Sequence, residues 1–131
     1  MQAIAETILL IKNTSGTLDK QRILQQHIVD APLKRVLKFI YNPYFKTGIS
    51  DAKLDSAPYY KGYPVPQDAD AMMQYLIEHP TGDKETCGIA NTWMLRQPTE
   101  LTRWLARGII TQNMQIGVTA TTLNKVFGSD F

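Results

Sequence analysis

The sequence has very little of what disulfide or metal chemistry requires. Its 131 residues include one cysteine, Cys87, and two histidines, His27 and His79. A single cysteine cannot form an intrachain disulfide, and these three side chains do not have a spacing typical of a zinc site. We therefore expect no metal site and interpret Cys87 as a small buried residue of a helix.

Long apolar runs are missing too. None approaches the roughly 20 residues that a bilayer-spanning helix needs, and the N-terminal stretch lacks the basic start of a signal peptide. The sequence therefore predicts a cytoplasmic protein with no membrane partner. Hydrophobic residues make up 44% of the chain and charged residues 20%, as in ordinary globular proteins. The length suits one domain spanning residues 1–131, which we expect to be a monomer.

A large excess of one charge is absent, since the net charge is only +2. The distribution is nevertheless uneven: residues 34–61 carry +4, residues 62–95 carry −4 and residues 96–125 carry +3. Two basic blocks that flank an acidic one suggest a molecule with one basic face. Solvated helix faces are the alternative interpretation, and composition alone favours that alternative.

Apolar residues recur at helical spacing through most of the chain, which predicts an all-α domain of about seven helices. Asp30, Asp68 and Thr119 are predicted N-caps, Thr17 or Ser15 is expected to cap the second helix, and Thr81 to start the fifth. Gln97-Pro98 is expected to open the sixth. The predicted apolar stripes fall within residues 3–11, 18–28, 33–40, 72–77, 87–95, 101–109 and 123–127.

Residues 42–67 break this pattern, because prolines and glycines recur there. The proline content argues against a long helix, and no alternating apolar pattern supports a pair of strands. We interpret the segment as a long loop, a feature that is often functional in a compact domain. It contains Tyr44, Tyr59, Tyr60 and Tyr63.

Two arginines of the sixth expected helix, Arg103 and Arg107, are four residues apart, hence about 6 Å apart along one face. Arginines so placed can reach successive phosphates of a duplex. Taken alone, the pair is more simply explained as exposed arginines that keep an amphipathic helix in water.

Residues 114–128, MQIGVTATTLNKVFG, place a glycine turn before the last helix. Thr119, Thr121 and Thr122 are expected to present hydroxyls and free backbone N–H groups at the helix start, which is a favourable place for anions. Lys125 follows within two turns. Such contacts touch the phosphate backbone and carry no base information. A helix hairpin with a good N-cap is the alternative interpretation.

Two segments resemble parts of a known family. The run LTRWLARGIITQNMQIGVTATTLNKVFG (101–128) resembles the signature of the N-terminal DNA-binding domain of ATP-dependent DNA ligases. The run DKQRILQQHIVDAPLKRVLKFIYNPYFKTGI (19–49) is similar to the matching part of the bacteriophage-type enzymes. Together they cover just under half of the chain, in the family's order, whereas residues 62–95 match only in helical character.

The resemblance implies an all-helical domain that serves DNA repair or replication. Such a domain binds double-stranded DNA from the minor-groove side around a nick, without sequence preference, and positions the nick for a ligase catalytic domain. The phosphate contacts that it implies are Gln115, Gly117, Thr119, Thr121, Thr122 and Lys125, with Arg103 and Arg107 contacting or steering the duplex. Lys46, beside the tyrosine turn, is a further candidate.

Catalysis in that family belongs to a nucleotidyltransferase domain with a Lys-x-Asp-Gly motif. The nearest string here is Lys53-Leu54-Asp55-Ser56, with serine in place of glycine and none of the downstream motifs. We therefore expect no catalytic residue and no cofactor in this chain. ATP and magnesium are expected only for a catalytic domain, absent from this chain, that acts in cis or in trans.

Two other functions stay open at this stage. The first is a helical protein-interaction module without DNA affinity, with the acidic middle or the tyrosine-rich loop as its contact surface. The second is a small enzyme that uses Lys53 and Asp55.

Overall fold

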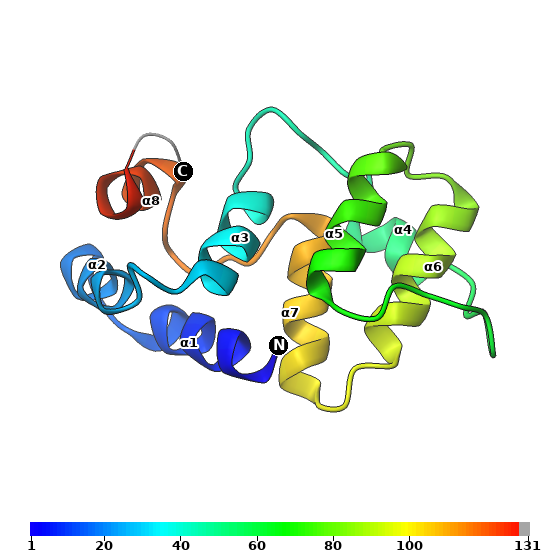
Figure 1. Ribbon diagram of the computed structural model, residues 1–131, viewed down its shortest axis with the longest axis horizontal. Coiled ribbons are helices and arrows are strands. Elements are labelled where there is room, and N and C mark those ends of the chain that lie inside the picture. Colours follow the sequence, from blue (N-terminus) through cyan, green and yellow to red (C-terminus); the bar gives the residue numbers. More distant parts are fainter. Residues whose placement is uncertain (129–131) are drawn as a thin grey trace.

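Eight α-helices and no strands are present in residues 1–128, the part of the chain that the computed structural model describes (Figure 1). The predicted all-α class is confirmed. No helix in this part is both long and apolar enough to cross a bilayer. In chain order the helices are α1 (Gln2–Asn13), α2 (Thr17–Gln26), α3 (Ala31–Ile40), α4 (Asp51–Asp55), α5 (Ala69–Glu78), α6 (Lys84–Leu95), α7 (Glu100–Thr111) and α8 (Ala120–Phe127).

The central helix of the single domain is α7, which packs against α1, α3, α5 and α6. Figure 1 shows it between α1 and α3 on one side and α5 and α6 on the other. Its buried stripe includes Leu105, Ala106, Ile109 and Ile110, none of which has measurable exposure to solvent. The last helix, α8, packs on α2. The C-terminal helix therefore lies beside a helix from the start of the chain.

Three predicted N-caps are confirmed. In each, the side-chain oxygen of the cap accepts a hydrogen bond from a backbone N–H in the first turn, which satisfies one of the unpaired donors of a helix start. These pairs are Asp30 with Leu33 (3.2 Å), Asp68 with Ala71 (2.8 Å) and Thr119 with Thr122 (3.3 Å).

Other helix starts differ from the prediction. Gly16 occupies the N-cap of α2 and no side chain caps that helix, so Thr17 and Ser15 were wrong candidates. Helix α6 begins after Asp83, and not at Thr81. Helix α7 begins after Thr99, which forms a reciprocal cap with Thr102. In each case several small polar residues stand close together, and the sequence alone does not rank them as caps.

The predicted loop at 42–67 contains a helix that the sequence analysis missed, α4. The Ser50 hydroxyl caps it by accepting a hydrogen bond from the N–H of Lys53 at 3.2 Å. The fully buried Leu54 anchors it, and α4 packs on α6. A helix of five residues is too short to show an apolar period, which is why the pattern did not reveal it.

The second half of the same segment is fastened along α6. The N–H of Tyr60 donates to the hydroxyl of Thr92 at 2.8 Å, and Arg96 donates to the carbonyl oxygens of Tyr63 and Tyr60 at 3.0 and 3.3 Å. Residues 59–63 therefore form a strap along α6, and this strap contains three of the four tyrosines of the segment.

Cys87 of α6 is only 4% exposed, as predicted, and burial raises the pKa of its thiol.

Candidate nucleic-acid interface

The turn between α7 and α8, together with α8 itself, carries most of the residues that the sequence singles out. Gln115 and Gly117 have φ angles of +52° and +78°, in the left-handed region. Because the chain alternates sides here, Gln115, Gly117 and Thr119 are exposed. The intervening side chains, Met114, Ile116 and Val118, are 5%, 1% and 7% exposed and anchor the turn in the core.

Directly behind this turn lies Lys20 of α2. Its Nζ donates to the carbonyl oxygen of Ile11, at the end of α1, at 2.6 Å, and to that of Ile116 at 3.0 Å. The side chain is 8% exposed. A Cβ on Gly117 would lie 3.1 Å from Cε and 3.2 Å from Nζ of Lys20, so the glycine permits this close approach.

Lys20 is a functional candidate that the sequence analysis missed. It precedes Leu24 by four residues, so both lie on the buried stripe of α2. A lysine in line with an apolar stripe is the signal that could have identified it. Its acceptor, the carbonyl oxygen of Ile116, lies 96 residues later in the sequence, and no local pattern indicates that the two will meet.

The start of α8 presents one threonine outward and one inward. Thr121 is exposed, and Lys125, four residues later, is exposed on the same face. Thr122 is 8% exposed, its N–H donates to the capping hydroxyl of Thr119, and its own hydroxyl lies 3.3 Å from that oxygen. Thr122 therefore supports the cap, unlike the expectation that all three threonines present free groups.

The two arginines expected to act as a pair point to different partners. Arg103 donates to the carbonyl oxygen of Gln97 at 3.0 Å, near the start of α7. Arg107 lies between the two carboxylates of α4 and donates to Asp51 at 2.8 Å and to Asp55 at 2.7 Å. The hydrogen bond that Arg107 donates to Asp51, followed by the one it donates to Asp55, raises the pKa of Arg107. Both guanidinium groups therefore have partners within the chain.

Arg107 nevertheless stays beside the turn. Its side chain is 35% exposed. It shares a hollow of 160 Å³ with Asp51, Trp104 and Gln115. A charge at this position can therefore act on an anion held at Gln115, although the carboxylates of α4 compete for the guanidinium.

Lys46 is exposed on a segment that is attached to the start of the same turn. The side-chain oxygen of Gln112 accepts a hydrogen bond from the N–H of Thr47 at 2.9 Å. The side-chain nitrogen of Gln112 donates to the carbonyl oxygen of Phe45 at 3.0 Å. The backbone on both sides of Lys46 is therefore fixed to the C-terminal end of α7.

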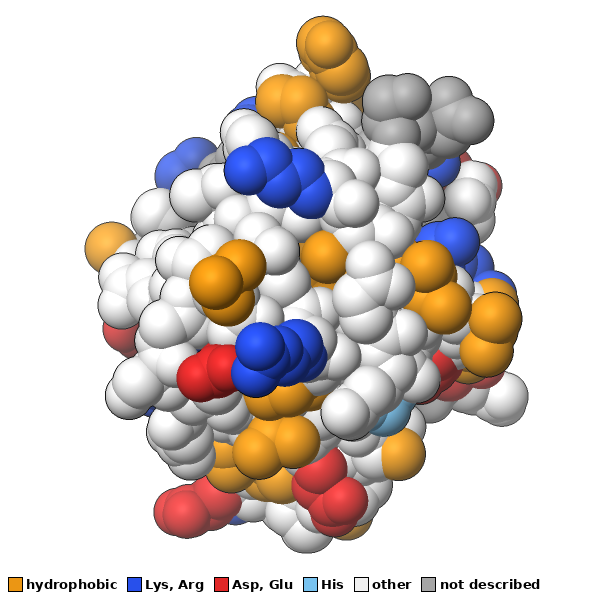
Figure 2. All heavy atoms as spheres, turned by 90° about the vertical axis from the view of Figure 1, so that its left-hand side faces the viewer, with side chains coloured by type: hydrophobic (Ala, Val, Ile, Leu, Met, Phe, Trp, Pro, Cys, Tyr) orange, Lys and Arg blue, Asp and Glu red, His pale blue; other side chains and the backbone are white. Residues whose placement is uncertain are grey.

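Basic side chains lie around α8. Figure 2 shows this face: several Lys and Arg side chains lie in its upper part, at the level of α8, another lies beside an acidic side chain near the middle, and further acidic side chains lie toward the sides and the lower edge. On α3, the Nζ of Lys34 lies 5.6 Å from the centre of the Phe127 ring.

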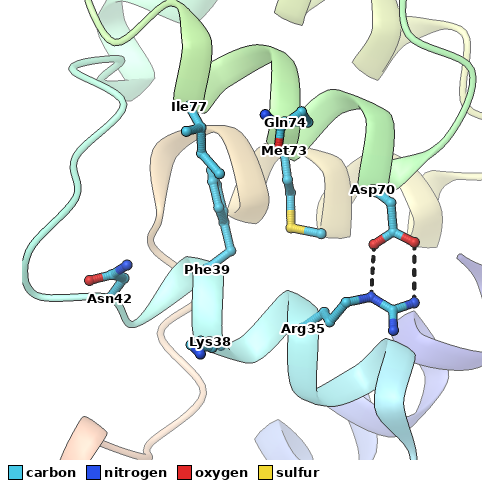
Figure 3. A pocket seen from close by; sticks show the side chains of 8 residues that line it. All are labelled: Arg35, Lys38, Phe39, Asn42, Asp70, Met73, Gln74 and Ile77. Atoms are coloured by element: carbon cyan, nitrogen blue, oxygen red, sulfur yellow. Dashed lines mark hydrogen bonds and ion pairs between the residues drawn. The ribbon is translucent and has the colours of Figure 1, made fainter. Parts of the chain in front are cut away.

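A second feature is an apolar groove between α3 and α5 (Figure 3). Its volume is 390 Å³, and Phe39 of α3 faces Met73 and Ile77 of α5 across it. At one end Arg35 makes two hydrogen bonds to Asp70, at 3.1 and 3.2 Å, which join the two helices.

The residues of the enzymatic alternative have structural partners. The Nζ of Lys53 donates to the carbonyl oxygen of Gly48 at 3.0 Å, whereas the carboxylate of Asp55 pairs with Arg107. No group of three or more His, Cys, Asp or Glu side chains within residues 1–128 is arranged to hold a metal ion.

Comparisons with known proteins add no family to these observations. A scan against protein-family models finds no match, and a search of curated proteins finds none either.

Proposed function

We propose that this chain binds double-stranded DNA without sequence preference and positions a nick for the catalytic domain of an ATP-dependent DNA ligase. The binding surface, called here the turn surface, consists of Gln115, Gly117, Thr119, Thr121 and Lys125. The observation that carries the proposal is the exposed turn lying directly over the ammonium group of Lys20. A phosphate on this turn would lie near the fixed positive charge of Lys20, which acts through space because its ammonium group is buried and donates to the carbonyl oxygens of Ile11, Lys12 and Ile116.

The donors of the turn surface suit a phosphodiester. The N–H groups of Ala120 and Thr121 have no acceptor within α8, because the first turn of a helix leaves its donors unpaired. The hydroxyl of Thr121 and the ammonium of Lys125 lie on the same face. Phosphate oxygens accept from all of these groups, and none of the contacts distinguishes one base from another.

Flanking cations extend the same surface. Arg107 adjoins Gln115 in one hollow, and Lys46 projects from a backbone segment held by Gln112. Such a distribution explains how a chain of net charge +2 could still bind a polyanion: only the local potential has to be positive. Binding of this kind falls steeply with salt, since phosphate contacts release counterions.

The test is fluorescence anisotropy with a labelled nicked duplex over a range of salt concentrations. We expect a dissociation constant of about 1–100 µM for the wild type. Lys125→Glu should weaken binding and lower the slope of log affinity against log salt by about one.

Lys61→Glu is the matched control, because it reverses the charge of another exposed lysine, on the strap along α6. It should leave binding close to that of the wild type. The proposal fails if the wild type shows no binding at low salt, or if the two substitutions weaken binding equally.

The apolar groove favours a second candidate function, a protein-interaction module. Phe39, Met73 and Ile77 offer a surface that an apolar side chain of a partner helix could enter. The partner that agrees with the first proposal is a ligase catalytic domain in trans. Calorimetric titration of the wild type and of Ile77→Arg with such a domain tests this second function. Binding that does not depend on salt concentration and is lost in the variant supports it.

A further inference from the structure

Helices α3 and α8 face each other with rows of residues that contain no carboxylate. On α3, Lys34 and Lys38 are four residues apart, hence on one face, and the Nζ of Lys34 lies 5.6 Å from the centre of the Phe127 ring of α8. Lys38 lines a pocket together with Ala120 and Asn124 of α8. Neither helix contains an Asp or a Glu. The space between the two helices therefore has basic side chains along one wall and no acidic residue on either helix.

The pocket between the end of α3 and the start of α8 has a volume of 260 Å³. Pockets that enclose drug-sized ligands hold roughly 300–1,000 Å³, so this one is of a size for a small group such as a single phosphate. None of the described residues that line it is acidic. A small pocket with a cation and without a carboxylate favours an anion over a metal ion.

The donors of this pocket lack partners in the described part of the chain. There, the ammonium group of Lys38, the hydroxyl of Tyr41 and the side-chain amide of Asn124 make no hydrogen bond or ion pair. The side-chain oxygen of Asn42 accepts a hydrogen bond from the N–H of Tyr44 at 2.8 Å, which leaves the NH₂ group of Asn42 to donate. Burial raises the pKa of Tyr41 and so keeps its hydroxyl protonated. A phosphate oxygen can accept from each of these donors.

The pocket adjoins the turn surface on α8. Ala120 and Asn124, which line the pocket, each precede one residue of the exposed pair Thr121 and Lys125, so the two pairs form neighbouring rows on the helix. A DNA strand whose backbone lies on Thr121 and Lys125 would pass beside the pocket. One phosphate of that strand can then enter the pocket while another stays on the turn surface.

We propose that this pocket binds one internal phosphate of the DNA strand held on the turn surface, with Lys38 and the hydroxyl of Tyr41 as donors. The inference rests on the proposed DNA-binding function and adds a second phosphate site to it. Two phosphates held side by side fix the direction in which the strand crosses α8, which a single contact does not. The phosphate is an internal one, because the 5′ phosphate at a nick has to remain accessible to the catalytic domain.

The experiment is a scan of nicked duplexes in which one phosphate at a time, close to the nick, is replaced by a neutral methylphosphonate. Anisotropy titrations of the wild type identify the contacted phosphates as the positions where this replacement weakens binding. Lys38→Gln should weaken binding to the unmodified duplex roughly fivefold to tenfold at about 0.1 M salt, and lower the slope of log affinity against log salt by about one. It should also be insensitive to replacement at one position, and Lys125→Gln at a different one.

Two further variants separate the donors from general effects of charge. Tyr41→Phe keeps the ring and the charge but removes the hydroxyl, so it should weaken binding about threefold and leave the salt slope unchanged. Lys61→Gln removes an exposed lysine on the strap along α6 and should keep the sensitivity of the wild type at every position. Melting temperatures close to that of the wild type show that each variant is folded.

A duplex that lacks the 5′ phosphate at its nick distinguishes the two kinds of phosphate. The effect of Lys38→Gln should be the same on this duplex, and loss of the effect would overturn the assignment to an internal phosphate.

The inference also fails if Lys38→Gln binds as the wild type does, or if it keeps the sensitivity of the wild type at every position, while Lys125→Gln still weakens binding. Either result leaves the proposed function standing. Absence of binding to any duplex at low salt overturns both.

Discussion

The side chain of Lys20 donates a hydrogen bond to the carbonyl oxygen of Ile116 at 3.0 Å, across 96 residues of sequence. The same ammonium group holds the carbonyl of Ile11 at 2.6 Å. One buried cation thus ties the end of α1 to the turn that precedes α8. The turn surface depends on this cation for its shape as well as for its charge.

Replacement of Lys20 by methionine should destabilise the whole domain. Methionine has a similar length but cannot donate, so two buried carbonyls lose a charged partner. We expect the free energy of unfolding to fall by about 2–3 kcal/mol, since a hydrogen bond to a charged group contributes roughly 1.5–3 kcal/mol. Urea denaturation measures it. Lys84→Met, at an exposed lysine, should change stability by less than about 0.5 kcal/mol, and an equal effect of both would contradict the assignment.

Gly117→Ala should destabilise more than Gly62→Ala. Both glycines have positive φ angles, +78° and +72°, so each substitution costs about 1–2 kcal/mol of backbone strain. Only at Gly117 does the added Cβ also meet Lys20, whereas nothing lies within 4 Å at Gly62. Crowding should add roughly 1 kcal/mol at Gly117. Thermal or urea denaturation of the two variants compares them, and equal losses would mean that Lys20 moves aside freely.

The carboxylates of Asp51 and Asp55 should restrain DNA binding by occupying Arg107. The Asp51→Asn, Asp55→Asn variant is expected to bind nicked duplex more tightly, because the guanidinium can then pair with a phosphate. Anisotropy titrations in an Arg107→Gln background provide the control. There, only the general loss of negative charge remains, so the gain should be smaller. An equal gain in both backgrounds would show that Arg107 takes no part. The three side chains are 35–63% exposed, so the folding cost should stay below about 1 kcal/mol.

Asp83 should make the stability of the domain depend on pH in the acid range. The N–H and then the hydroxyl of Thr86 hydrogen-bond its carboxylate and lower its pKa below the ordinary 3.8. Because the pKa is lower in the folded state, the ionised carboxylate of Asp83 stabilises the fold at pH values above 3.8. This stabilisation is lost as the pH falls through the pKa of the folded state.

Asparagine at this position caps a helix without titrating, so Asp83→Asn tests the effect. Melting temperatures measured from neutral pH into the acid range should fall less steeply for the variant than for the wild type. If the melting temperatures of the two proteins fell in parallel with pH, Asp83 would not contribute to the acid dependence of stability.

Periodicity located the long helices, but it did not give the burial of every stripe residue or the features that depend on tertiary contacts: Leu18, Ile28 and Leu95, assigned to apolar stripes, are 70%, 42% and 47% exposed. The stripe of α7 and the caps Asp30, Asp68 and Thr119 follow from local sequence, and the structure contains them as predicted. Ile77 was assigned to the core but is 47% exposed, since it lies at the end of α5 on the open groove. Periodicity indicates which face is apolar and does not indicate whether a neighbour covers it.

The candidate site was predictable only in part. The exposed positions of the turn surface follow from the glycine turn and the threonine cap. The burial of Thr122 and the pairing of Arg107 with α4 do not, because each depends on an element whose position is set by packing far away in sequence.

The packing of α1 on α7 and of α2 on α8 makes folding a prerequisite for the DNA binding proposed above. Contacts between such distant segments form slowly, because a long loop must close before they contribute. During synthesis, the turn surface would gain its shape and its buried cation only after α8 has emerged and met α2. A ligand that recognises this surface binds the folded chain alone and should therefore raise its melting temperature. DNA affinity would then measure the integrity of the entire domain, although the proposed contacts come mostly from the last third of the chain.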